Sequence, residues 1–329
     1  MSLTVEWFQG NDAEWDRFIL QDSRNGLFLE TRKFINYHPV NRFLDRSLCI
    51  RKGNALVGAI LACEIEEDGK RIFFAHKGTT FGGISISSQV YSATHMDELL
   101  QAVLAFLEQE GFDKVYLKLV PEIYQRNDSS LVDYFLYKNG FQCYDELNFY
   151  MHLNRYRTDV LSQFSSGKRR DYRYSLKNNL QFRLLETEGE IASYYEVLLK
   201  NLKKLDLPVV HSLEDLYDLR FHRFPDWIRF YGVYLEDQII AGSMIFLFNN
   251  NSIFHTQYLS SDEEYLKLFP MDFLIENLIE TAAKENFDLF SFGICTEDQG
   301  RYINLGLSRF KEGFGTEYCI NRSYEFDLK

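Results

Sequence analysis

The feature that most constrains the fold of this chain is a short sequence motif that occurs once in each half. Residues 137–141 read Y-K-N-G-F and residues 310–314 read F-K-E-G-F, so the two pentapeptides match position for position. In each half the pentapeptide ends a short helical pattern and leads into a strand-like pattern. Because repeated sequence units form repeated structural units, the repeated motif predicts that the chain is built twice from one plan.

The order of the expected elements supports this interpretation. The first half has a hairpin (48–65), a strand (71–76), an amphipathic helix (95–112), a strand (113–120), a short helix (130–140) and a final strand (141–153). The second half has the same order at 230–248, 252–259, 269–287, 288–294, 299–312 and 316–327. We therefore expect two domains, 1–153 and 154–329, the second with a mostly helical insert at 155–222 that has no counterpart of similar length.

Composition narrows the class of protein. No apolar run reaches the roughly 18 residues that a membrane helix needs, and the N-terminus lacks the pattern of a signal peptide. The five cysteines are scattered and form no C-x-x-C pair, which argues against disulfides and zinc and favours a cytoplasmic location. The net charge of −12 opposes sequence-independent nucleic-acid binding. Residues 155–177 differ, because they hold seven Lys or Arg against two Asp.

The repeated unit resembles the GNAT acyltransferase fold, and two units in tandem look like the FemABX aminoacyltransferases, which build peptidoglycan cross-bridges from aminoacyl-tRNA. The segments that carry the resemblance are G-K-R-R-D-Y-R-Y-S-L-K-N-N (167–179), Y-Y-E-V-L-L-K-N (194–201), L-P-V-V-H-S (207–212), Y-L-S-S-D (258–262), F-S-F-G-I (290–294) and R-F-K-E-G-F-G (309–315). The resemblance implies an α/β fold with mixed sheets, made of two tandem GNAT-like domains, and an acyltransferase activity.

The acyl donor is the next question. A GNAT domain grips the pyrophosphate of coenzyme A with Q/R-x-x-G-x-G/A at a helix N-terminus, where the backbone favours anions. Neither half has this motif, and Asp262, Glu263 and Glu264 would repel phosphate at the equivalent place in the second half. We therefore expect no resident cofactor and, by the resemblance, aminoacyl-tRNA as donor. An acyl-CoA or carrier thioester with a metabolite or peptide amine remains the alternative.

Lys311, in R-F-K-E-G-F-G, has two interpretations. A lysine in the last helical turn compensates carbonyl partial charge, with Gly313 as a left-handed cap, and Lys138 in the first half would do the same. By resemblance, Lys311 matches a family lysine that assists transfer electrostatically. Phe310 and Phe314 are expected to pack in the core.

A cationic ridge is expected on the helix near residue 170. Arg169, Arg173 and Lys177 are spaced four apart, and Lys168 and Arg170 flank them. One interpretation is a solvated helix face. The other is a binding surface for a polyphosphate, such as a nucleotide-linked precursor or a tRNA backbone, helped by the interleaved Tyr172 and Tyr174. Arg309 joins these five residues as a candidate substrate contact.

Acyl transfer to an amine also needs oxyanion stabilisation and proton transfer. The backbone N–H groups of strand 252–259 are expected to stabilise the oxyanion. His255 and His211 are candidate bases, and Tyr258 and Tyr302 are candidate proton donors. The loop T-F-G-G-I (80–84) is either a backbone approach to substrate or a plain loop. A rival from another class is a non-catalytic module that binds a nucleotide or tRNA.

Overall fold

The computed structural model describes residues 3–248 and 252–328, which divide into two compact units. The first unit consists of the chain up to Glu146, Glu297–Tyr302, and the chain from Cys319 onward. The second consists of Leu147–Thr296 and Ile303–Tyr318. The expected boundary between residues 153 and 154 lies inside the second unit, and most of the last strand belongs to the first.

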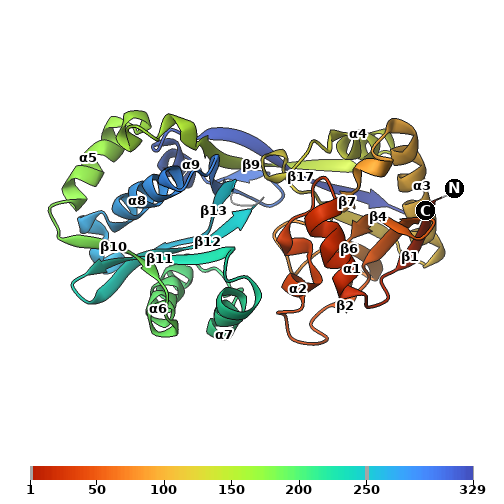
Figure 1. Cartoon of the computed structure of the whole chain (residues 1–329), viewed down its shortest axis with the longest axis horizontal. Helices are drawn as coiled ribbons and strands as arrows, with labels where there is room; N and C mark the ends of the chain where they lie inside the picture. Colours follow the sequence, from red (N-terminus) through yellow and green to blue (C-terminus); the bar gives the residue numbers. More distant parts are fainter. Residues whose placement is uncertain (1–2, 249–251, 329) are drawn as a thin grey trace. The chain divides into compact units, whose positions relative to one another are not determined.

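The first unit contains two sets of strands (Figure 1). An antiparallel sheet has the order β1-β3-β4-β7, with strands β1 (Leu3–Trp7), β3 (Leu48–Lys52), β4 (Ala55–Ile60) and β7 (Ile84–Ile86). A second run has the order β17-β8-β6-β5-β2, in which β6 and β8 are parallel. Its strands are β17 (Glu317–Asp327), β8 (Lys114–Lys118), β6 (Lys70–Ala75), β5 (Cys63–Glu67) and β2 (Leu44–Asp45).

Four α-helices accompany these strands: α1 (Asp12–Arg17), α2 (Arg32–Ile35), α3 (Ala93–Gln109) and α4 (Ser130–Lys138). The α3 helix shows why the sequence folds this way. Ser92 caps its N-terminus by accepting from His95 N, and Gly111 follows its end at φ +76°. Its buried residues recur at steps of three and four and pack on the sheet: Met96, Leu99, Leu100, Val103, Leu104 and Leu107.

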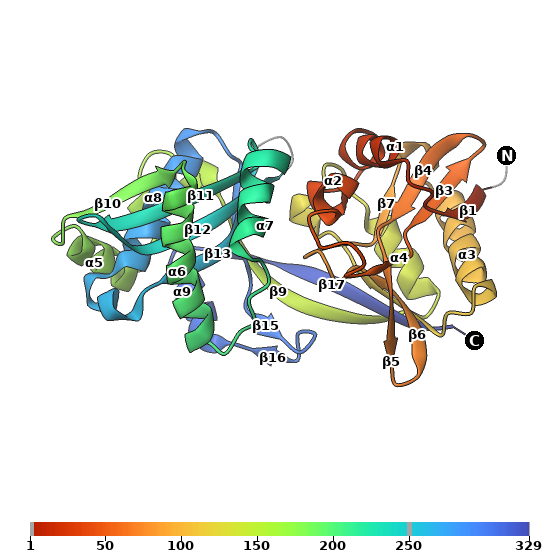
Figure 2. The ribbon, with the colours of Figure 1, turned by 90° about the horizontal axis from the view of Figure 1, so that it is seen from below.

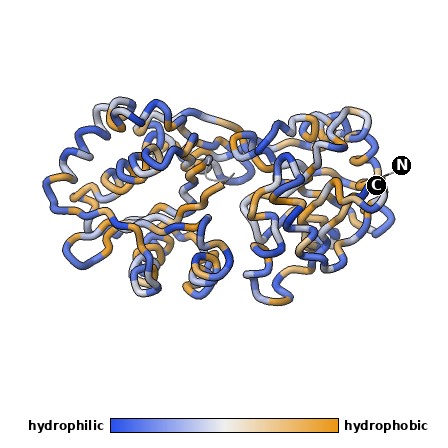
Figure 3. Tube along the Cα trace, viewed as in Figure 1, coloured by the Kyte–Doolittle hydropathy of each residue, from blue (hydrophilic) through white to orange (hydrophobic). Residues whose placement is uncertain are grey.

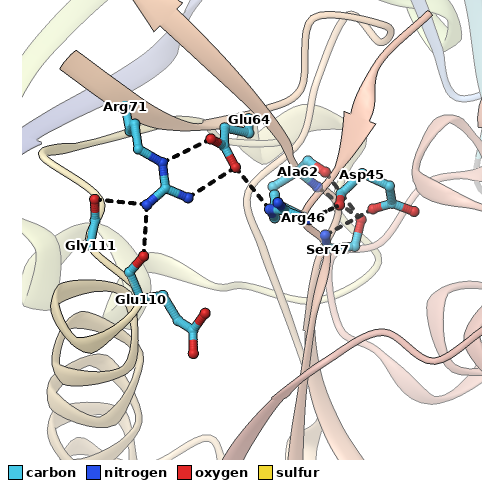
Figure 4. Close-up of polar contacts among 8 residues, drawn as sticks. All are labelled: Asp45, Arg46, Ser47, Ala62, Glu64, Arg71, Glu110 and Gly111. Carbon is cyan, nitrogen blue, oxygen red and sulfur yellow. Dashed lines mark hydrogen bonds and ion pairs between the residues drawn. The ribbon is translucent and has the colours of Figure 1, made fainter. Parts of the chain in front are cut away.

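A hydrogen-bond network around Glu64 of β5 links the strands, through Arg71 of β6, to the end of α3 (Figure 4). Its carboxylate accepts from Arg71 Nε and from Arg46 Nε, each at 2.9 Å. Arg71 Nη1 also donates to the carbonyls of Glu110 and Gly111, at 2.8 and 3.0 Å. Hydrogen bonding from Arg71, with that from Arg46, lowers the pKa of the Glu64 carboxyl.

The second unit is built on a mixed sheet of order β10-β11-β12-β13-β14-β9. Its strands are β10 (Leu180–Leu185), β11 (Ile228–Leu235), β12 (Gln238–Phe248), β13 (Ile253–Ser261), β14 (Leu289–Ile294) and the part of β9 (Gln142–His152) from Leu147 onward. Its helices are α5 (Ser166–Ser175), α6 (Glu188–Lys204), α7 (Leu213–Tyr217), α8 (Pro270–Lys284) and α9 (Leu305–Glu312). Figures 1 and 2 show α8 on one face of this sheet and α6 and α7 on the other.

A hydrophobic core fills the space between this sheet and α8. Phe254 and Phe290, on neighbouring strands, stack at 5.6 Å, and Leu274 and Leu278 of α8 are fully buried in the same cluster. Figure 3 shows hydrophobic residues concentrated along the strands, with hydrophilic residues on the turns. Burial of this apolar surface holds the sheet in place.

Three sequence expectations need correction. The segment 155–222, expected to be mostly helical, also contains the strand β10, and β10, α6 and α7 precede their hairpin as β1, α1 and α2 precede β3 and β4. The expected helix 299–312 begins only at Leu305, since β15 (Thr296–Glu297) and β16 (Tyr302–Ile303) form a small hairpin first. Gly313 is right-handed at φ −58°, and the left-handed residue is Gly315 at φ +87°.

Within residues 3–248 and 252–328, no helix is both long and apolar enough to span a membrane. In the same residues, no three His, Cys, Asp or Glu side chains are grouped so that they could hold a metal ion.

Candidate functional site

The central feature of the second unit is the parting of two parallel strands. β13 pairs with β14 at Ile253–Leu289, Phe254–Phe290 and His255–Ser291, and the pairing ends there although β13 continues to Ser261. Both strands are irregular at this point. Gln257 is an extra residue in the pairing of β13 with β12, and Phe292 is an extra residue in the pairing of β14 with β9. The split leaves β13 without β14 as a backbone pairing partner beyond His255, within the strand 252–259.

Lys311 fixes the bend of β14. Its ammonium group donates to three successive carbonyls, those of Phe292 (3.1 Å), Gly293 (3.0 Å) and Ile294 (2.6 Å). Those three bonds use all the donors of an ammonium group. The carbonyls converge because Gly293 has φ +70°, a conformation that favours glycine. Lys311 is 3% exposed, and this burial lowers its pKa to about 8.

The corresponding lysine of the first unit behaves differently. Lys138 is exposed, its Nζ pairs with Asp97 at 2.6 Å, and Gly140 behind it is left-handed at φ +83°. Lys311 is therefore not an ordinary lysine of a last helical turn, since its side chain enters the sheet. Phe310 and Phe314 pack with the core, as predicted.

His255 occupies the last paired position of β13. Its Nδ1 lies 3.2 Å from Ser291 Oγ, and its ring lies 5.6 Å from the ring of Phe248. Burial, and then the charge of Lys311, lowers the pKa of His255 to about 3. The imidazole is therefore neutral at ordinary pH and weakly basic.

Tyr258 and His211, which the sequence marked separately, are in contact. Tyr258 Oη lies 2.6 Å from His211 Nδ1, and the His211 carbonyl accepts from Tyr195 Oη at 3.0 Å. Tyr258 is on β13, whereas His211 lies in the segment between α6 and α7. The strand and the helical segment thus meet one residue after the Gln257 bulge.

Ion pairs within the unit neutralise two of the five residues of the cationic ridge. Lys168 Nζ lies 2.8 Å from Asp272 Oδ1 and 4.1 Å from the centre of the Phe310 ring, and Arg170 pairs with Asp171 at 2.9 Å. Arg169 and Arg173 have no ion-pair partner among the residues that the structure describes. Lys177 follows the end of α5 and lies 5.0 Å from the centre of the Tyr174 ring.

The interleaved tyrosines pack within the unit. Tyr172 stacks on Phe273 of α8 at 6.3 Å, and Tyr174 stacks on Phe269 at 5.9 Å. Burial raises the pKa of the Tyr172 phenol. Both rings therefore already have a stacking partner, which the sequence interpretation did not foresee.

The N-terminus of α8 is where a GNAT domain would receive a pyrophosphate. Here the first turn contains Pro270, which has no N–H, and Asp272, whose buried carboxylate pairs with Lys168. The preceding Asp262 caps the short helix η8 (Glu263–Leu268) and pairs with Lys200 at 2.6 Å. A carboxylate of the chain itself thus occupies the anion-favouring turn.

Comparison with known proteins relates this chain to the GNAT acyltransferases. Residues 165–312 match the acetyltransferase (GNAT) domain family, and no curated protein sequence matches the chain. The crystal structure of FemX aligns over 98% of this chain and 97% of that chain, with a TM-score of 0.71 and 12% identity. This chain has a FemX-like tandem GNAT fold.

Two further structures share the tandem GNAT fold. The C-terminal domain of a putative lysylphosphatidylglycerol synthetase from Agrobacterium fabrum has a TM-score of 0.63 and 11% identity, over 95% of this chain and 91% of that chain. A tandem GNAT protein from the clavulanic acid biosynthesis pathway has a TM-score of 0.58 and 10% identity, over 100% and 99%. At such identities the likeness concerns the fold, and it confirms the predicted fold class.

The remaining candidates of the tandem GNAT fold are on α9, on β16 and in the loop 80–84. Arg309 is exposed on α9 and donates from Nε to the Leu305 carbonyl at 3.2 Å. Tyr302 is 57% exposed on β16. The loop 80–84 packs within the first unit, since a Cβ on Gly83 would lie 2.8 Å from Leu119 Cδ2, and a plain loop explains it.

Sequence reasoning missed two features of this site. The carbonyl cluster of residues 292–294 had no signal apart from Gly293. Asp272, which neutralises Lys168, had a weak signal as an acidic residue in the first turn of a predicted helix.

Proposed function

We propose that this protein is an acyltransferase of the Fem type. It moves an aminoacyl group from aminoacyl-tRNA to an amine of a phosphate-bearing acceptor, such as a peptidoglycan precursor. The observation that carries the proposal is the split between β13 and β14 beyond His255 and Ser291, in a domain that matches the GNAT family. A split strand presents unpaired backbone N–H groups in a fixed direction, which is what a developing oxyanion needs.

Each site residue has a role in this proposal. Lys311 positions β14 through three carbonyls and keeps a positive charge beside the split. His255 acts as a neutral positioning group, since a pKa of about 3 makes it a poor base for an ammonium substrate. Tyr258 is the group of this set that can exchange a proton with substrate.

The α8 N-terminus supports a tRNA ester as donor over coenzyme A. Asp272 already occupies the first turn, and Glu263 and Glu264 add negative charge before it. A pyrophosphate placed there would meet carboxylates in place of free N–H groups. A tRNA ester carries single phosphodiesters and no pyrophosphate, so it does not require an anion site at this turn.

The cations on α5 and directly after it support a phosphate-bearing partner. Arg169, Arg173 and Lys177 remain available after Lys168 and Arg170 are neutralised within the unit. Arginine binds phosphate through two parallel hydrogen bonds. We propose that these three residues, with Arg309, contact phosphates of the tRNA or the acceptor.

A transfer assay tests the proposal. Purified protein is incubated with aminoacyl-tRNA or with acyl-CoA, together with a panel of amine acceptors that includes nucleotide-linked cell-wall precursors, and products are identified by mass spectrometry. Transfer from aminoacyl-tRNA supports the proposal. Transfer from acyl-CoA alone, or coenzyme A bound to the purified protein, favours the thioester alternative. Binding of tRNA without turnover of any donor favours a non-catalytic module.

The phosphate contacts have a separate test. The double variant Arg169→Gln with Arg173→Gln is expected to weaken tRNA or acceptor binding and to reduce its dependence on salt concentration. Arg157→Gln, an exposed arginine that precedes α5, is the matched control. Equal affinity of the double variant and the control would remove the ridge from the proposal.

A further inference from the structure

The contact between His211 and Tyr258 carries an inference about proton transfer. The two residues are 47 positions apart, and their side-chain atoms lie 2.6 Å apart, a short distance for a phenol and an imidazole. A second bond fixes the histidine, because Tyr195 of α6 donates to its carbonyl at 3.0 Å. The pair therefore links the α6–α7 segment to the strand at which β13 and β14 part.

The bulge at Gln257 directs Tyr258 toward this segment. On β13, Phe254 packs in the core beside α8, whereas Tyr258 contacts His211 and Ser260 Oγ lies 3.3 Å from Tyr194 Oη of α6. A bulge inserts one residue and thereby changes the face to which the following side chains point. Without it, the alternation of the strand would direct Tyr258 to the same face as Phe254, toward α8.

The chemistry of the pair leaves one side of the phenol open. When Tyr258 donates its single proton to His211 Nδ1, the oxygen keeps lone pairs that can accept from a substrate amine. Tyr258 is partly exposed, whereas His211 is buried. The tyrosine is thus the member of the pair that can contact a substrate, and the histidine is the member that can be protonated temporarily.

We infer that Tyr258 and His211 form a proton relay for acyl transfer, an inference that rests on the proposed function. The amine nitrogen bonds to the acyl carbon and loses a proton to Tyr258 Oη, while the Tyr258 proton passes to His211 Nδ1. The bond from the acyl carbon to the leaving oxygen then breaks. The imidazolium returns its proton to Tyr258 as Tyr258 protonates the leaving oxygen, so one proton moves from the amine to the leaving group.

The surroundings favour a shuttle over a permanently ionised tyrosine. Burial raises the pKa of the Tyr258 phenol, with a further contribution from Tyr195, and the nearby Tyr194 phenol is also raised by burial. The phenols around the pair therefore stay neutral at ordinary pH, and burial, followed by the charges of Glu214 and Asp215, raises the pKa of Tyr195 as well. The phenol therefore relays the proton without ionising, and the imidazole holds the proton between the two transfers.

Leaving-group chemistry tests the relay. An ester releases a strongly basic alkoxide that needs a proton, whereas a thioester releases a thiolate whose conjugate acid has a pKa of about 8.5. Tyr258→Phe is expected to lower kcat by about 10²- to 10⁴-fold with an aminoacyl ester donor. With a thioester of the same acyl group the loss is expected to be smaller, since only the removal of the amine proton is affected there and proton donation to the leaving group contributes little. Equal losses for the two donors would overturn the inference.

His211→Asn separates the relay from simple positioning. Asparagine can accept the Tyr258 hydrogen bond but cannot take its proton, so the ester reaction is expected to slow as it does in Tyr258→Phe, with KM unchanged. Wild-type kcat in His211→Asn would reduce His211 to a positioning residue and overturn the relay. Tyr234→Phe, which removes a hydroxyl from β11 in the same sheet, is the control and is expected to keep wild-type kcat.

The outcomes distinguish this inference from the proposed function. A wild-type protein that turns over no ester donor contradicts the proposed function and the relay with it. A wild-type protein that is active, with variants that keep its kcat, contradicts the relay alone. Circular dichroism and thermal unfolding of each variant establish that the comparison is between folded proteins.

Discussion

Lys168 Nζ lies 2.8 Å from Asp272 Oδ1, and this ion pair joins the basic helix α5 to the first turn of α8. The two side chains are only 14% and 10% exposed, and Lys168 also faces the rings of Phe310 and Phe314. Lys168 therefore connects two segments that carried the family resemblance, 167–179 and 309–315, to α8. It also explains why Gly313 is glycine, since a Cβ there would lie 2.8 Å from Lys168 Cγ.

Removing Lys168 is expected to destabilise the protein strongly. Lys168→Met leaves the Asp272 carboxylate buried and unpaired, a change that costs roughly 3 kcal/mol in the free energy of unfolding. Burial already raises the pKa of Asp272 and Lys168 opposes this, so the variant raises it further. The folded variant then takes up a proton more readily than the unfolded chain as pH falls, and its deficit shrinks. Urea unfolding at pH 8 and pH 5 measures both effects.

The matched control is Lys138→Met in the first unit. Lys138 and Asp97 form a pair at 2.6 Å, slightly shorter than the Lys168–Asp272 pair, but their side chains are 46% and 42% exposed. An exposed pair contributes about 0 to 1 kcal/mol. Similar losses in the two variants would show that burial of the Lys168–Asp272 pair has no energetic consequence.

Gly315 is expected to tolerate alanine less well than Gly140. Both have positive φ, +87° and +83°, so alanine costs about 1 to 2 kcal/mol of backbone strain at either position. At Gly315 the added Cβ would also lie 2.7 Å from the Gln163 carbonyl oxygen, whereas no atom lies within 4 Å at Gly140. Thermal unfolding of the two variants should therefore show the larger loss for Gly315→Ala. A larger loss for Gly140→Ala would contradict the packing around Gly315.

Much of the fold could be predicted from sequence because its signals are local. The period of α3, the glycine after it and the repeated Y/F-K-x-G-F motif lie within short windows. The errors arose where local signals compete. Residues 180–185 have only a partial alternation of buried and exposed positions, so the sequence predicted a helical region there and not the strand β10. The turn at 298–300 has three successive residues with positive φ, and the helical pattern of residues 299–312 gave no signal of this turn.

The candidate site was predicted only in part, because its contacts are long-range. The sequence identified Lys311, His255, Tyr258 and Lys168 as residues with suitable chemistry. It could not indicate that Lys311 meets the carbonyls of 292–294, or that Lys168 meets Asp272 104 positions away. Such pairings depend on how the sheet splits and where α8 begins. The burial of each side chain then determines which groups stay charged, and the hydrophobic periodicity of the sequence does not predict the burial of these polar side chains.

Two histidines are expected to stay neutral in mildly acidic solution. Burial, and then Lys311, lowers the pKa of His255 to about 3, and burial lowers that of His76 to about 4. NMR of the imidazole groups should show that the rings of His76 and His255 do not titrate between pH 8 and pH 5, and His255→Gln should remove one of these signals.

The same two pKa values predict how the free energy of unfolding changes in acidic solution. Since the folded-state pKa lies below the unfolded value of about 6.5, stability is present above that pH and lost as pH falls below it. The loss is up to about 1.4 kcal/mol per pH unit for each histidine, so His255→Gln should have a shallower slope. A His255 ring that titrates near pH 6.5 would contradict its burial beside Lys311.

Lys311→Met is expected to lower stability and to change its dependence on alkaline pH. The variant leaves three carbonyls of β14 without their donor, a loss of at least about 1 to 3 kcal/mol. In the wild type, burial lowers the pKa of Lys311 from 10.5 to about 8, so the unfolded chain binds the extra proton between these values. Wild-type stability therefore gains from this group as pH rises from 8 to 10.5, by up to about 1.4 kcal/mol per unit, and the variant lacks that gain. Guanidinium unfolding of both proteins from pH 7 to pH 10 measures the difference, with Lys138→Met as the exposed control. Parallel curves for the wild type and Lys311→Met would show that the ammonium group is not buried against β14.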